Sequence, residues 1–185
     1  DLPSPGHVVE ALCNTVREDA STHRYPLPRG GRRLREAVAA WYSRRFGVEL
    51  DPESEVLPLV GSKEGLTHLF FSYLTPDDLA LIPSPCYPAH YNGTLLTGTK
   101  LHLMPLAQER GFLPDLKGLP KAAQKAKLLL VNYPNNPTGA VVEGLGFFEE
   151  CLRFARRTGC LVVHDNAYSE ITFDGYRAPS FLQVP

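Results

Sequence analysis

Two clusters of polar residues in the second half of the chain have the residue types of a ligand-binding site. The first is NNPTG at 135–139, and the second is HDNAY at 164–168. Each cluster directly follows a short run rich in leucine or valine, and such runs are typical of buried parallel strands. The carboxyl ends of neighbouring parallel strands form the edge where ligands bind in open α/β sheets. We therefore expect an amide, a carboxylate and a phenol to meet in one pocket.

Asp165 is the strongest candidate for chemistry among these residues. A carboxylate at the end of a buried strand costs free energy unless it meets a cation or several hydrogen-bond donors. Two other interpretations stay open: an aspartate that caps a following helix, or one half of a metal-binding pair with His164. The pair lacks the further His and Asp ligands that a metallophosphatase would need, so we expect no metal.

A third cluster, GSKEG at 61–65, lies between a predicted strand and a predicted helix. Gly61 permits close approach of the backbone, and the helix N-terminus offers free N–H groups and a positive dipole end. With the Ser62 hydroxyl added, these groups suit a phosphate. A serine N-cap that follows a turn glycine would explain the same residues equally well. The loop matches neither the Walker A pattern nor the GxGxxG dinucleotide pattern.

The rest of the chain predicts the framework for these clusters. Apolar spacing predicts helices over 7–19, 31–46, 64–74, 89–96, 116–124 and 143–158, and strands over 56–60, 79–82, 100–106, 127–132 and 160–164. Gly47 fits the exit of the second helix. Strands that alternate with helices of this size predict a three-layer α/β/α fold with a mainly parallel sheet. The prolines gather at strand ends, where they stop strands and hold loops.

The composition restricts the possible partners. The 185 residues are 43% hydrophobic and 21% charged, with a formal net charge of −1, which gives no electrostatic footprint for nucleic acid or an anionic membrane. We expect a small-molecule partner. No apolar run approaches the ~18 residues of a spanning helix, and residues 1–5 lack the pattern of a signal peptide. The four cysteines form no CxxC pair, which predicts buried, reduced thiols and favours the cytoplasm.

The pairing of NPTG with DxAY resembles the class I/II aminotransferases, which are fold-type-I enzymes that use pyridoxal 5′-phosphate (PLP). The resemblance runs along nearly the whole chain. Within the family, the sequence is most similar in character to the branch of aspartate and LL-diaminopimelate aminotransferases. It implies an N-terminal region over 1–45, part of the PLP-binding large domain over 46–185, and an absent C-terminal small domain. It also implies a homodimer that transfers an amino group between an amino acid and a 2-oxo acid.

The resemblance assigns roles to the polar residues. Asp165 would pair with the protonated pyridine nitrogen and so make the ring an electron sink. Asn136 and the Tyr168 hydroxyl would bind the 3′ oxygen of the cofactor. The remaining contacts would come from Gly61, Ser62 and the Lys63 backbone on the phosphate, from Tyr87 on the pyridine face, and from Tyr25 of the neighbouring subunit on the phosphate. Other members carry tryptophan in place of Tyr87.

Each of these assignments has an ordinary structural alternative. Asn136 would also suit an Asx turn, and Tyr87 would also suit core packing. Tyr25 lies in the stretch YPLPRG at 25–30, so it would equally suit a surface loop.

The Schiff-base lysine of the family has no counterpart in this chain. Family members carry it in an S-x-x-K-type segment after DxAY, and none of the lysines at 63, 100, 117, 121, 125 and 127 has that context. We therefore interpret the chain as an incomplete large domain, in which the predicted strand Val56–Val60 lacks its usual neighbouring strands in the sheet. Two further hypotheses share these motifs: a PLP-dependent lyase, and a naturally short, non-catalytic module for ligand binding or dimerisation.

Overall fold

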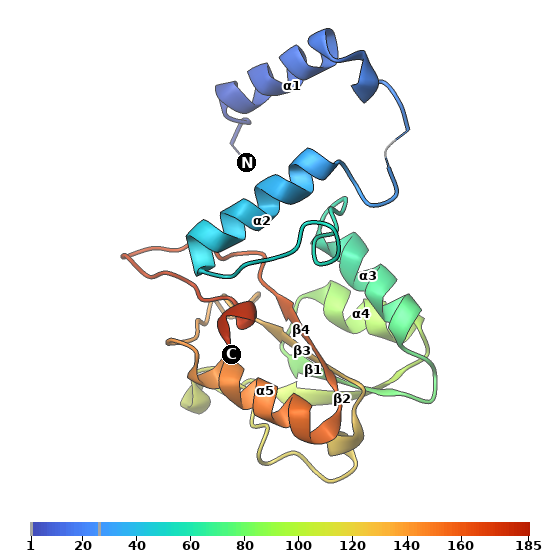
Figure 1. Cartoon of the computed structure of the whole chain (residues 1–185). Coiled ribbons are helices and arrows are strands. Elements are labelled where there is room, and N and C mark those ends of the chain that lie inside the picture. The colour runs from blue at the N-terminus through green and yellow to red at the C-terminus, as the bar shows by residue number, and fades with distance from the viewer. Residues whose placement is uncertain (1, 26) are drawn as a thin grey trace.

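Four parallel strands form the centre of the molecule in the computed structural model, which describes residues 2–25 and 27–185. Asp1 and Pro26 lie outside the described residues. The strands are β1 (Leu79–Ser84), β2 (Lys100–Pro105), β3 (Leu128–Asn132) and β4 (Leu161–Asp165), and their order in the sheet is β2-β1-β3-β4 (Figure 1). All three ladders are parallel. The α/β fold with a parallel sheet, predicted from the sequence, is therefore confirmed.

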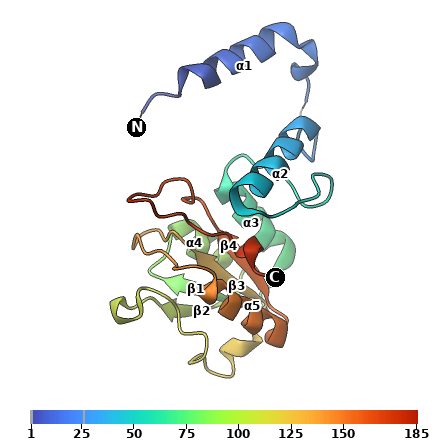
Figure 2. The same ribbon diagram turned by 60° about the vertical axis from the view of Figure 1, so that its left-hand side comes forward.

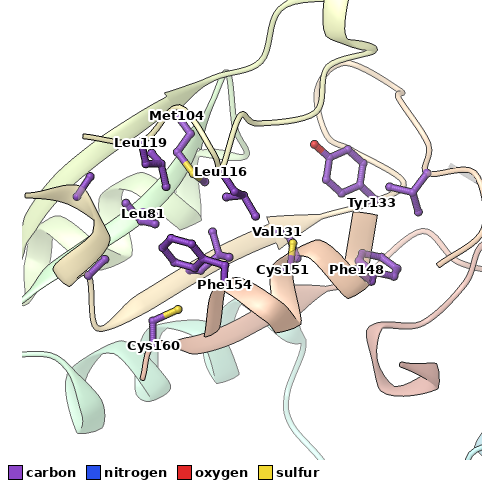
Figure 3. Close-up of a cluster of buried hydrophobic side chains, with 14 residues drawn as sticks. Leu81, Met104, Leu116, Leu119, Val131, Tyr133, Phe148, Cys151, Phe154 and Cys160 are labelled. Atoms are coloured by element: carbon purple, nitrogen blue, oxygen red, sulfur yellow. The ribbon is translucent and has the colours of Figure 1, made fainter. Parts of the chain in front are cut away.

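Helices cover both faces of this sheet, as a three-layer fold requires (Figures 1 and 2). Helices α3 (Ser62–Tyr73) and α4 (Pro88–Leu96) lie on one face, and α5 (Gly146–Thr158) lies on the other. Successive strand residues point to opposite faces. Leu128 and Leu130 of β3 accordingly pack with the α3 side chains, whereas Leu129 packs with the α5 cluster that Figure 3 shows. Burial on both faces explains the continuous apolar runs in the sequence.

The N-terminal helices lie outside the sheet. Helix α1 (Gly6–Glu18) buries none of its residues and stands apart from the strands in both views (Figures 1 and 2). Helix α2 (Arg32–Phe46) ends at Gly47, whose φ of 67° gives the left-handed exit predicted for it. Arg45 of α2 forms an ion pair with Glu170 at 2.8 Å and so ties α2 to the segment after β4. No described helix has the length and apolar character needed to cross a membrane.

Short 3₁₀ turns complete the fold. They are η1 (Ala20–Thr22), η2 (Gln108–Arg110), η3 (Ala123–Lys125) and η4 (Phe181–Gln183).

The predicted strand at Val56–Val60 is absent, so that prediction was wrong. Pro58 has no N–H to give to a ladder, and the Val60 N–H donates to the Glu64 carboxylate at 2.7 Å instead. The Val60 side chain is 92% exposed. The edge strands of the described sheet are β2 and β4, and β4 pairs with β3 alone. An apolar run without a neighbouring strand therefore stays an extended loop here.

The predicted helix at 116–124 was also wrong, because only the short η3 forms there. The Asp115 carboxylate accepts hydrogen bonds from the N–H groups of Lys117 at 3.2 Å and Gly118 at 3.0 Å. Such Asx turns compete with helix formation. Leu116 and Leu119 still enter the core, but they do so from a loop.

The four cysteines are free thiols, but they are not all buried. Cys151 and Cys160 lie in the core, Cys86 is half-buried, and Cys13 is exposed. The prediction of buried thiols was wrong for Cys13 because it lies on α1, which packs against no part of the described sheet.

Candidate active site

Five of the predicted site residues line one hollow at the carboxyl edge of the sheet. Its volume is about 130 Å³, and its walls are Ser62, Tyr87, Asn132, Asn136, Asp165, Ala167 and Tyr168. These residues come from the start of α3, the start of α4, and the ends of β3 and β4 with the loops that follow them. Residues separated by more than 100 positions in the sequence therefore meet where parallel strands end. A larger cavity of about 610 Å³ shares Asn136 and Tyr168 with this hollow.

Asp165 is buried at the end of β4, with 8% of its surface exposed. One carboxylate oxygen, Oδ2, lies 2.8 Å from Nε2 of His90, a fully buried residue of α4. Among the described residues, the other oxygen has no hydrogen-bond donor. The residues that follow Asp165 form a turn and no helix, so the helix-cap interpretation was wrong. The carboxylate is thus held at one oxygen and is open to a cationic group at the other.

His90 was not predicted from the sequence. It follows Tyr87 by three positions, and the two rings meet edge to face with centroids 5.6 Å apart. Residues three apart share a face of a helix, so a histidine three residues after a pocket tyrosine was a signal that sequence reasoning could have used. Nδ1 of His90 is buried and has no hydrogen-bond partner among the described residues.

His164 points away from Asp165 and does not form a metal pair with it. Its Nδ1 accepts a hydrogen bond from the Phe181 N–H at 3.3 Å, and its Nε2 lies 3.1 Å from the Tyr133 carbonyl, which requires Nε2 to be the donor. The ring packs on Phe148. Burial lowers the pKa of His164 to about 4. Within residues 2–25 and 27–185, no three His, Cys, Asp or Glu side chains are placed to hold a metal ion.

Asn136 places its side-chain amide in the hollow. Its Nδ2 donates to the Tyr168 hydroxyl at 3.1 Å. The turn of the loop is closed by the neighbouring Asn135, whose Oδ1 accepts from the Thr138 N–H at 3.1 Å and from the Thr138 hydroxyl at 2.7 Å. Because Asn135 forms the Asx-type turn, the Asn136 side chain is left for the pocket. The Tyr168 oxygen accepts from Asn136, so its own proton is available to a further acceptor.

The N-terminus of α3 faces the same hollow. Gly61 is the N-cap residue, with a φ of 84° that favours glycine, and no side chain caps the helix. The alternative of a serine N-cap was therefore wrong: Ser62 lies inside the first turn and lines the hollow. The uncapped N–H groups and the Ser62 hydroxyl together suit an anion. The Lys63 ammonium lies 5.6 Å from the centroid of the Tyr87 ring.

Three predicted site residues do not line the hollow: Gly61 and Lys63, which flank Ser62 at the start of α3, and Tyr25. Tyr25 lies between η1 and α2, is 99% exposed and lines no part of the hollow. Its assignment to a neighbouring subunit stays a prediction.

The parallel sheet thus carries an acidic residue, an amide and a phenol at its carboxyl edge. The family model for aminotransferase class I and II matches residues 2–184. The chain therefore belongs to the class I and II aminotransferases.

Particular relatives share about half of the aligned residues. The LL-diaminopimelate aminotransferase of Moorella thermoacetica is 52% identical over 186 residues, and that of Syntrophobacter fumaroxidans is 51% identical over 186 residues. In both comparisons the alignment covers 100% of this chain and 47% of the relative. The chain thus spans about half the length of the curated relatives it matches.

Solved structures share the fold closely. A probable N-succinyldiaminopimelate aminotransferase from Thermus thermophilus superposes with a TM-score of 0.89 and 41% identity, and the match covers 100% of this chain and 49% of that one. The substrate-bound BacF structure from Bacillus subtilis gives a TM-score of 0.92 at 41% identity, with 99% of this chain and 46% of that chain covered.

Proposed function

We propose that these 185 residues are the N-terminal and central part of a PLP-dependent aminotransferase that transfers an amino group between an amino acid and a 2-oxo acid. The observation that carries the proposal is the Asp165 carboxylate, which is buried, held at one oxygen by His90, and exposed to the hollow that Ser62, Asn136 and Tyr168 also line. The family uses PLP in general.

The groups around the hollow fit PLP. A cationic ring nitrogen matches the free side of the Asp165 carboxylate, and the phosphate matches the uncapped N-terminus of α3. The 3′ oxygen matches the amide of Asn136 and the proton of Tyr168. Tyr87 offers a flat face for the ring. The ring nitrogen, the phosphate and the 3′ oxygen thus each have a partner of suitable charge in this chain, whereas the aldehyde has no Schiff-base lysine among these residues.

Bound PLP supplies an electron sink that stabilises negative charge at the carbon next to the amino group. Asp165 contributes by holding a proton on the ring nitrogen, since a negative charge at hydrogen-bond distance favours the charged form of its partner. Asn136 and Tyr168 stabilise negative charge on the 3′ oxygen through two hydrogen bonds. His90 orients the Asp165 carboxylate through Nε2, which lies 2.8 Å from Oδ2.

We propose LL-diaminopimelate as the amino donor to test first, because the relatives that are 47–52% identical carry the name LL-diaminopimelate aminotransferase. We also propose a homodimer in which Tyr25 reaches the phosphate of the neighbouring subunit, and a cytoplasmic location, to which the four free thiols would be suited.

The test uses the full-length protein that contains this chain. Purified protein is titrated with PLP and then supplied with LL-diaminopimelate, with and without a 2-oxo acid acceptor. We expect cofactor binding with a visible absorbance band, and amino transfer that requires the acceptor. Release of a 2-oxo acid without an acceptor would indicate lyase chemistry instead. A reading frame that ends at Pro185 would contradict the proposal that this chain is part of an active enzyme.

A further inference from the structure

Asn132 joins the two loops that carry the pocket residues. It is the last residue of β3, pairs with Asp165 in the parallel ladder, and is 1% exposed. Its Nδ2 donates to the Asp165 carbonyl at 2.8 Å and to the Pro134 carbonyl at 3.3 Å, and its Oδ1 accepts from the Asn136 N–H at 2.9 Å. The donor and the acceptor of this buried side chain are both used, and they bridge β4 and the loop after β3.

Asparagine has the chemistry that this position requires. Its planar amide carries a donor and an acceptor side by side. Aspartate would turn an acceptor toward two carbonyl oxygens and would add a second carboxylate beside Asp165. Leucine has a similar size but would leave the Asp165 carbonyl and the Asn136 N–H without this partner in a buried place, and such groups are costly to leave unpaired.

The bridge fixes the distance between two groups that face the hollow. Asp165 offers a carboxylate there, and Asn136 offers an amide. Among the described residues, the Asn136 N–H has Asn132 as its sole acceptor. The ring nitrogen that Asp165 would bind and the 3′ oxygen that Asn136 would bind are held at a fixed distance by one rigid aromatic ring, so the spacing of the two backbones must match that distance. A mismatch of about 1 Å in such a site can reduce a rate by about 100-fold.

We propose that Asn132 is a positioning residue that sets the spacing between Asp165 and Asn136 for the bound cofactor. This inference rests on the proposed function, because it needs a ring that both residues bind. Asn132 acts through the backbones of these two residues, and its effect should therefore be visible in the bound cofactor itself as well as in the rate of the reaction.

The experiment compares two variants of Asn132 with a control in the same strand, all in the full-length protein. Asn132→Leu removes all three side-chain hydrogen bonds, and Asn132→Ser leaves space for water and should fold more readily. Leu130→Ala is the control, because Leu130 is fully buried two residues earlier but contacts the α3 side of the core. Two measurements are the dissociation constant for PLP and the pH at which the absorbance of the bound cofactor changes. The third is the hydrogen exchange of the Asn136 backbone N–H in cofactor-free wild-type protein.

We expect both Asn132 variants to bind PLP at least about tenfold more weakly, which is typical of a buried polar group that loses its partner, and to shift the pH of the absorbance change. Leu130→Ala should lower the melting temperature without that shift. The backbone N–H of Asn136 in the wild-type protein should exchange slowly with solvent before cofactor is added.

Two results would overturn the positioning role alone. One is wild-type affinity and absorbance in a folded Asn132 variant. The other is rapid hydrogen exchange of the Asn136 backbone N–H in the wild-type protein. This result would overturn the positioning role even if neither variant folds. A wild-type protein that binds no PLP would instead contradict the proposed function and this inference together.

Discussion

The half-buried, neutral His164 makes the stability of the fold depend on pH. Its pKa is lowered from 6.5 to about 4, chiefly by burial. The unfolded chain therefore takes up this proton at a higher pH than the folded chain, and stability falls as the pH drops from about 6.5 to about 4. Each tenfold change in an equilibrium constant corresponds to ~1.4 kcal/mol. Protonation of this residue in the unfolded state therefore lowers the free energy of unfolding by ~3 kcal/mol once the pH is well below 4. About 2 kcal/mol of this loss falls between pH 7.5 and 5.

The assay is urea unfolding of the full-length protein at a series of pH values. In His164→Gln, an amide replaces the ring and can both accept and donate a hydrogen bond, but it does not titrate. We expect the wild type to lose ~2 kcal/mol more than this variant between pH 7.5 and 5. His68→Gln is the matched control for the replacement of a histidine by glutamine, because the His68 side chain is 71% exposed.

Equal pH dependence in wild type and His164→Gln would refute this reasoning. It would mean that the imidazole gains a proton as easily in the folded state as in the unfolded state, and that the hydrogen bond from the Phe181 N–H to Nδ1 does not hold the neutral form.

Three further predictions concern the pocket, the helices and the isolated chain. Tyr168→Phe removes the hydroxyl that accepts a hydrogen bond from Asn136. PLP should bind several-fold more weakly, and the absorbance of the bound cofactor should change at a higher pH. The same pH as in the wild type would contradict the contact of Tyr168 with the 3′ oxygen. Gly93→Ala places a Cβ 3.1 Å from the Phe70 ring and should cost ~1–3 kcal/mol in urea unfolding, while Gly146→Ala, with open space around it, should be neutral or slightly stabilising. The isolated 185-residue chain, with β4 as an open edge, should associate or melt without cooperativity, and a sharp melt from a monodisperse monomer would contradict this.

Much of the site could be predicted because its residues lie in two short motifs that follow apolar runs. A run of Leu or Val that is buried on both faces is a strong sign of a parallel strand, and the polar residue after such a run can only lie at the sheet edge. Asn136, Asp165 and Tyr168 were located in this way, and the structure brings them together. The GSKEG loop gave a weaker signal for Ser62, and the resemblance to a family then added Tyr87.

The residues that sequence reasoning missed act on other residues of the site. His90 holds the Asp165 carboxylate from a helix, and Asn132 joins two backbones, so each depends on contacts between segments far apart in the chain. The two wrong elements have a similar cause. Val56–Val60 has the composition of a strand but no neighbour to pair with, and the local hydrogen bonds of Asp115 override the helical spacing after it. Tertiary pairing and local side-chain bonds are not visible in apolar periodicity.

The rate of the half-reaction in Asp165→Ala tests the central claim most directly. Full-length wild type and variant are loaded with PLP and mixed with the amino donor in single-turnover conditions, and the absorbance of the cofactor is followed. Removing a charge that stabilises the transition state by several kcal/mol should slow this step by several orders of magnitude, at ~1.4 kcal/mol for each tenfold, while cofactor binding weakens less. Near-normal turnover in Asp165→Ala would contradict the assignment of this carboxylate to the ring nitrogen and, with it, the proposed active site.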